Sequence, residues 1–339
     1  MANIFLRSPY YISQTQQGSG LSVKLNINID GTDRYLLTKN KPSSSFVLFE
    51  VSELIRDYLD IKYNGTPLAS DFNVVVILTY TWYSGLNGSG TVEGTPYVVN
   101  VFGIDAYGYH EDGSNPTTTK GYMQSNSVIY KLSGDSIIFP IDTNNTSAIG
   151  LYEDGSQIGS ANVIPVTGEV FQYITISDSA VDEVRITNTD GIKSVSIVTV
   201  DECKFEPVKL SFINKFGALQ DLMFFKKSTK KINVKGESYN RFTSNGDTGA
   251  YDVNVHQKQT YNVTSSKEIT INTGYVSEDY NEPMEELLQS EYVWMKIGAV
   301  LTPMNVEKKS MTFKTSLNNK MVDYTLDLSY SYNAINNIR

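Results

Sequence analysis

The sequence predicts a mainly β protein of two or three β-sandwich domains, immunoglobulin- or fibronectin-like in class, with a few short helices. Apolar and polar residues alternate with a period of two along many segments, which is typical of strands with one buried face. Strand-like segments recur at a spacing of roughly 8–12 residues, as they do in sandwiches. The chain also holds 23 Tyr, whose rings suit both half-buried strands and subunit interfaces.

The length and composition allow more than one core. The 339 residues are 40% hydrophobic and 19% charged, which is ordinary for folded domains. We expect an N-terminal β-rich domain with one short helix at 1–110, an acidic β-sandwich domain at 111–202 and a C-terminal α+β domain at 203–339.

The first domain is predicted from four strands and one helix. Segment 21–29 alternates strictly, whereas 72–83 is nearly all apolar and therefore reads as a central strand. A helix is predicted over 50–59, with Ser52 as its N-cap, because its apolar residues fall on one helical stripe. The remaining strands are predicted at 46–49 and 97–103.

The middle domain begins with a Gly-, Ser-, Asn- and Thr-rich linker at 111–126. Its clearest feature is Asn188-Thr189-Asp190-Gly191, which predicts a hairpin turn because glycine tolerates positive φ. The predicted strands are 127–132, 136–141, 148–152, 169–177, 183–187 and 194–200.

The third domain mixes strands with the best helix of the chain. The helix is predicted at 278–291, where Pro283 suits the first turn and acidic residues crowd the N-terminal end. Residues 215–222 fit either a helical turn or a β-arch. The predicted strands are 208–213, 222–226, 231–235, 250–263, 267–272, 311–316 and 321–332.

Charge is distributed unevenly along the chain. The formal net charge is −9, and residues 111–202 alone carry 4 Lys/Arg against 13 Asp/Glu. Such an acidic surface opposes non-specific binding of nucleic acid. It fits solvated loops, a surface that faces cations, a basic partner, or a passage through which DNA slides. The basic segment 226–235 fits a nucleic-acid patch or, since no aromatic residue interrupts it, a contact with an acidic neighbouring surface.

Catalytic and metal-binding chemistry is hard to find. One cysteine, Cys203, rules out an intrachain disulfide, and two histidines leave no Cys/His zinc site. His110 and His256 lie in polar stretches without a catalytic motif, and the acidic residues before Cys203 oppose thiolate formation. We expect no catalytic, cofactor-binding or metal-binding residue, and no enzyme. The longest apolar runs are strand-sized, and no signal peptide or membrane segment is expected.

Three stretches, Ser45–Asp60, Leu210–Lys227 and Lys320–Arg339, together covering 54 of the 339 residues, resemble segments of virion structural proteins of tailed bacteriophages. The similarity is to crAss-like and marine podovirus types, whose proteins of this kind belong to the neck and tail. The resemblance implies a homo-oligomeric ring in the virion, neighbouring neck and tail proteins, and passing contact with phage DNA. It also implies synthesis in the bacterial host cytoplasm. It carries over no catalytic or ligand residue.

The C-terminus is the predicted contact with a neighbouring subunit, through Asn336, Asn337, Ile338 and Arg339. The alternative function is a glycan- or receptor-binding tail fibre or adhesin module, for which Trp82 with Tyr80 and Tyr83 forms the candidate aromatic cluster. In so apolar a strand, however, core packing is favoured for Tyr80 and Trp82. A depolymerase ranks last, because no β-helix repeat or recognisable acid pair is present.

Overall fold

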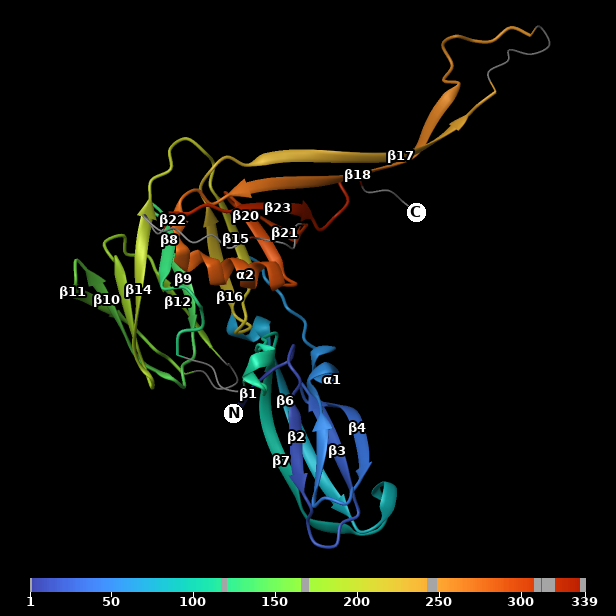
Figure 1. Cartoon of the computed structure of the whole chain (residues 1–339), viewed down its shortest axis with the longest axis vertical. Helices are drawn as coiled ribbons and strands as arrows, with labels where there is room; N and C mark the ends of the chain where they lie inside the picture. The colour runs from blue at the N-terminus through green and yellow to red at the C-terminus, as the bar shows by residue number, and fades with distance from the viewer. Residues whose placement is uncertain are drawn as a thin grey trace.

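The structure, a computed structural model, describes residues 2–116, 121–165, 171–242, 249–307, 312 and 321–335. It confirms a mainly β protein (Figure 1). The hydrogen-bonded sheets follow the order of the chain: β1–β7, β8–β14 and β15–β23 each pair only among themselves. We refer to these groups as the first, middle and third units.

The first unit consists of a five-stranded sheet, β1-β7-β6-β3-β4, and the two-stranded sheet β2–β5. Apolar side chains from both sheets, such as Leu25 and Trp82 from the large sheet and Phe49 from the small one, form one core. The elements are β1 (Ala2–Phe5), β2 (Tyr11–Thr15), β3 (Ser22–Ile29), β4 (Thr32–Asn40), β5 (Phe46–Glu50), α1 (Ser52–Arg56), β6 (Asn73–Tyr83) and β7 (Val92–Ile104).

The helix of the first unit is shorter than predicted and starts differently. α1 covers only Ser52–Arg56, and Ser52 is its first helical residue, whereas Val51 occupies the N-cap position. The Ser52 hydroxyl bonds to the Glu50 carboxylate instead of a helix N–H group. The chain then leaves the helix so that Ile61 can enter a different core, at the junction between the units.

The middle unit packs the five-stranded sheet β11-β10-β13-β14-β8 against the pair β12–β9. The predicted hairpin is confirmed: Asn188 pairs with Gly191, whose φ is 124°. The strands are β8 (Val128–Leu132), β9 (Ile137–Ile141), β10 (Thr146–Glu153), β11 (Ser156–Ala161), β12 (Gln172–Ile176), β13 (Glu183–Asn188) and β14 (Gly191–Val200).

The third unit is a seven-stranded sheet, β16-β15-β20-β21-β23-β18-β17, covered by α2 and the short pair β19–β22. Met284 and Leu287 of α2 are buried against it. The elements are β15 (Val208–Ile213), β16 (Leu219–Phe224), β17 (Thr229–Asn240), β18 (Lys258–Asn272), β19 (Val276–Ser277), α2 (Asn281–Gln289), β20 (Val293–Ile297), β21 (Val300–Val306), β22 (Met321–Val322) and β23 (Thr325–Tyr330). Short 3-10 turns lie at Ala69–Phe72, Leu86–Gly88, His110–Asp112 and Glu278–Tyr280.

Several predicted elements of the third unit change. The two strands predicted at 250–263 and 267–272 are one strand, β18, because the ladder with β17 runs on through Ser265 and Ser266. The helix-or-arch segment is a tight turn that leads directly into β16. The predicted strand at 311–316 lies outside the described residues, apart from Thr312.

Candidate assembly interface

A two-stranded ribbon of β17 and β18 projects from the third unit, away from the other two units (Figure 1). We call residues 231–267 the ribbon arm; its described part is 231–242 and 249–267. β18 joins the body of the sheet only through its last residues, where Glu268–Asn272 pair with β23. At the roughly 3.3 Å rise of a strand, the ten residues from Lys231 to Asn240 extend about 30 Å.

The ribbon arm is a regular ladder with one irregularity. β17 and β18 pair in antiparallel register from Thr229↔Thr270 to Asn240↔Lys258, with a shift between Lys235 and Glu237. Asn262 adopts a positive φ of 50° at this bulge. A Cβ on Gly236 would lie 2.9 Å from Thr260 Cγ2 and 3.3 Å from Val263 Cγ2, so a larger residue at this position would have to displace these side chains.

Within the described residues, no third strand covers the arm. β17 is the last strand of its sheet, and β23 ends its pairing with β18 at Ser329↔Glu268. Beyond that point, one backbone bond reaches the outer edge of β18, from Ala334 N to Ser265 O at 3.0 Å. Open edges of this length are templates for pairing with another chain.

Large apolar side chains of the arm lie in solvent. Ile232 and Val234 on one face of β17 are 57% and 61% exposed, and Phe242 and Val253 beyond the strands are 89% and 82% exposed. The other face carries Tyr239 and Tyr261, whose rings meet edge to face at 5.6 Å between centroids. The exposed set is Ile232, Val234, Tyr239, Phe242, Tyr251, Val253, Tyr261 and Val263. Monomeric proteins rarely leave so many large apolar groups on one feature.

The strand that leads into the arm is basic. Residues 226–242 contain six Lys or Arg and one acid, Glu237. Lys226 pairs with Glu202 at 2.7 Å, and Lys231 with Glu268 at 3.3 Å. No ion pair with another described residue neutralises Lys227, Lys230 or Lys235. The apolar surface of the arm is therefore accompanied by positive charge that no ion pair within the described chain compensates, at Lys235 in the arm and at Lys227 and Lys230 just before it.

The arm stands on a rigid base, because one apolar cluster joins all three units. The first unit contributes buried side chains such as Phe72 and Ile104, the middle unit Met123 and Phe171, and the third unit Leu219. Such a shared core resists relative motion of the units. The direction in which the arm projects is thus set by the fold of the whole chain.

Polar contacts reinforce this junction. Asn214, fully buried, donates to the Met123 carbonyl at 2.8 Å and accepts from the backbone N–H groups of Phe216 and Ala218 at 3.0 and 3.2 Å. Arg56 lies 2.7 Å from Glu291 and 3.6 Å from the buried Asp105, whose pKa is raised, chiefly by burial. These bonds link loops that are far apart in the sequence.

A buried acid on α2 also faces the junction. Glu286 is fully buried, its carboxylate lies 3.6 Å from the Lys215 ammonium, and neither oxygen has a well-aligned hydrogen-bond donor. Burial raises the pKa of Glu286 to about 7, while Lys215 and Ser125 act in the opposite direction. Lys215 also pairs with the more exposed Glu282.

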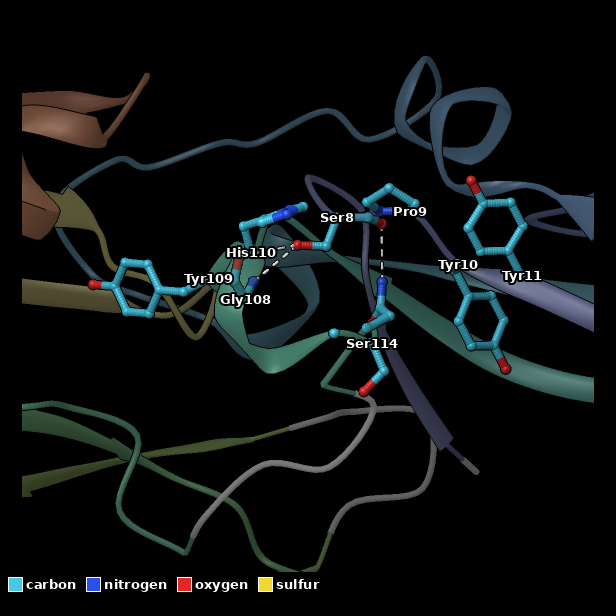
Figure 2. Close-up of a pocket in the computed structure, with 10 residues that line it drawn as sticks. Ser8, Pro9, Tyr10, Tyr11, Gly108, Tyr109, His110 and Ser114 are labelled. Atoms are coloured by element: carbon cyan, nitrogen blue, oxygen red, sulfur yellow. Dashed lines mark hydrogen bonds between the residues drawn. The ribbon is translucent and has the colours of Figure 1, made fainter.

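A pocket of about 410 Å³ in the first unit is the clearest hollow near aromatic side chains. Figure 2 shows Tyr109 on the opposite side of this pocket from Tyr10 and Tyr11, so the rings form no single platform. Ser8 accepts from Gly108 N at 2.9 Å, and the Asn115 amide donates to the carbonyls of Phe5 and Ser8. These polar side chains therefore bond to backbone groups of the fold itself.

The residues singled out from the sequence have different outcomes. Asn336, Asn337, Ile338 and Arg339 lie outside the described residues, and the chain before them lies beside β18. Trp82 and Tyr80 are each 1% exposed, which confirms that they belong to the core. His110 and His256 are exposed, as their polar surroundings predicted, and Cys203 is exposed as well.

The ribbon arm itself was missed. Its two strands were predicted in part, but periodicity indicates a strand without indicating how many neighbours it has. The available signal was the Lys-rich segment at 226–235 running into a long β-prone stretch, since lysine is typical of exposed strand edges.

Comparison of the chain with protein-family models and with curated proteins finds no match. Among the described residues, no three His, Cys, Asp or Glu side chains are grouped to hold a metal ion. No helix in the described ranges has the length and apolar character to cross a membrane.

Proposed function

We propose that this chain is a non-enzymatic structural subunit of a bacteriophage virion, a neck or tail ring protein that assembles by subunit–subunit contacts around the DNA passage. The observation that carries the assembly part is the ribbon arm, a two-stranded extension with exposed apolar side chains and no third strand among the described residues. An isolated ribbon is marginally stable in water. A neighbouring subunit would supply the missing contacts.

The geometry of the arm allows assembly into a ring. The arm projects away from the body (Figure 1), so the surface that receives it on a neighbour is a different surface. Contacts between two different faces are heterologous, and they close into rings when the rotation per subunit allows it. The shared core at the junction of the three units supports this role, because a ring needs subunits of fixed shape.

The assignment to a phage rests on the resemblance of the three stretches described above. Their segments include α1, the β15–β16 turn and the C-terminal strands, all of which lie outside the arm. The virion location, the neighbouring neck and tail proteins and the passing contact with DNA belong to this proposal. So does the immunoglobulin- or fibronectin-like class of the first and middle units.

The acidic middle unit fits a passage for DNA. Residues 111–202 have a net charge of −9, which repels phosphate and allows a duplex to slide without sticking. The glycan-binding alternative is not carried forward, because the Trp82 and Tyr80 rings that it requires are buried.

Negative-stain images of the purified chain test the proposal. We expect rings with a central opening and one dominant rotational symmetry. Open filaments of uniform width would contradict closure, and dispersed single particles at high protein concentration would contradict assembly altogether.

A further inference from the structure

The middle unit contains a groove with two unpaired strand edges. Among the residues that the structure describes, β12 pairs only with β9 and β11 pairs only with β10, so each lies at the end of its sheet. A groove of about 430 Å³ lies between these edges; it is lined by Leu151, by Ser160–Asn162 and by 172–178, which includes all of β12. The edge strand β11 has the sequence Ser-Gln-Ile-Gly-Ser-Ala, without the Lys or Pro that usually protects an edge.

The two ends of the groove differ in chemistry. At one end, the side chain of Gln172 accepts from Ile164 N at 2.9 Å and donates to the Asn162 carbonyl at 3.3 Å, which ties the chain across the groove. At the other end, Asp178 lines the groove. Asp182, four residues further along the chain, accepts a 2.9 Å bond from the backbone N–H of Asp154 in the turn between β10 and β11. The open end is therefore acidic.

We infer that this groove receives the ribbon arm of a second copy of the chain, with the arm lying beside the free edge of β12. This inference rests on the proposed assembly and names its contact. The arm brings what the groove lacks: an unpaired strand edge, the exposed apolar side chains of Ile232 and Val234, and uncompensated lysines for the acidic end. Addition of a strand to an open edge is an established mode of protein recognition.

The arm cannot fill the groove of its own chain. Figure 1 places β10 and β11 at one side of the molecule and the tip of the arm at the opposite side. The contact must therefore form between copies, and it joins unlike surfaces, as a ring requires. The arm spans positions 231–267, which provides the 20–30 residues that each partner contributes to a standard interface of about 1,600 Å².

Charge supports the same pairing. The strand that carries the arm has six cations against one acid over 226–242, whereas the middle unit has 4 cations against 13 acids over 111–202. Complementary potentials of this kind guide association and set the register of the contact. A second copy supplies this match with no further component.

Cross-linking between copies tests the inference. In a Cys203→Ser background, one sample carries Val234→Cys in the arm and a second carries Thr175→Cys in β12; both positions are exposed. After each variant is shown by light scattering to oligomerise, the two are mixed, and a short bismaleimide is added. We expect a band of two chains on a denaturing gel. The matched control replaces the β12 variant with Leu36→Cys, on the 64% exposed Leu36 of the first unit, and we expect no such band.

The outcomes separate the two proposals. An oligomer that gives no band with Thr175→Cys, or an equal band with Leu36→Cys, overturns the groove as the receptor and leaves the assembly proposal standing. A strong band from Val234→Cys alone shows that arms pair with arms and overturns it as well. A chain that never oligomerises contradicts the proposed function itself.

Discussion

Glu286 shows how one residue at the junction makes stability depend on pH. Its carboxyl group is buried beside Lys215, and its pKa rises from 4.5 to about 7 in the folded chain. The folded state therefore holds a proton that the unfolded state releases. By linkage, the free energy of unfolding falls as pH rises from about 4.5 to about 7. Above that range this group changes it no further.

We predict that Glu286→Gln stabilises the protein at pH 8, because it removes the cost of ionising a buried acid. The gain is about 3 kcal/mol, which is the rise of the Glu286 pKa from 4.5 to about 7 expressed as free energy. It should shrink toward zero near pH 4.5, where both chains carry a neutral side chain. Urea unfolding of both proteins at several pH values measures the difference. Glu285→Gln, on the same helix, is the control; a gain for Glu286→Gln that does not depend on pH would contradict the account.

Asn214 is the residue on which the polar part of the junction depends. Its amide satisfies the Met123 carbonyl and two N–H groups of the turn before β16. We predict that Asn214→Ala lowers the free energy of unfolding by about 2–3 kcal/mol, because buried backbone groups lose their partners. Chemical denaturation measures the loss. The exposed Asn240→Ala serves as the control, and an equal effect of both changes would refute the assignment.

At the scale of elements, alternation predicted most strands but not their partners. Segment 21–29 was found because one of its faces is buried and the other is exposed, and 72–83 because it is nearly all apolar. Segments 183–187 and 194–200 were found because an Asp-Gly turn joins two β-prone runs. β4 and β11 were missed because both are edge strands with exposed residues on both faces, so their sequences carry no period of two. The same physics hides the ribbon arm, since a strand that buries nothing in its own chain leaves no pattern.

The charge of the arm and of the residues that lead into it gives a prediction at this scale. Changing Lys227, Lys230 and Lys235 to Glu should slow association by about tenfold at low salt, with little effect on folding, because exposed charges act mainly on the rate of encounter. Stopped-flow light scattering after dilution of concentrated salt measures the rate. The same changes at Lys24, Lys39 and Lys62 of the first unit form the control. Equal slowing in both variants would mean that net charge, and not the arm, controls assembly.

At the scale of the whole molecule, the shared core makes three units into one body. Sequence indicated separate regions of different charge, but a core built by residues as distant as Phe72, Phe171 and Leu219 has no local signature. The sequence could not predict the candidate interface for the same reason. Only the folded chain shows that the arm projects from the body and that the groove between β11 and β12 lies on the opposite side.

The shared core predicts cooperative unfolding. Phe72→Ala should cost about 3–5 kcal/mol, the range for large aromatic residues in a core. Scanning calorimetry should show one transition for the parent chain and one, at lower temperature, for the variant. Phe242→Ala, at an exposed position of the arm, is the control and should not change the unfolding temperature of the dissociated chain. Separate transitions for the three units would contradict a single body.

The mass of the particle in solution tests the central claim most directly. Light scattering on a sizing column compares the full chain with a variant in which residues 235–264 are replaced by an Asn-Gly turn, so that Val234 and Ser265, which pair in the ladder, are joined by a hairpin. We predict a defined closed oligomer for the full chain and a folded monomer for the shortened one. A monomeric full chain, or an oligomer that survives loss of the arm, would contradict the claim that the chain assembles through this arm.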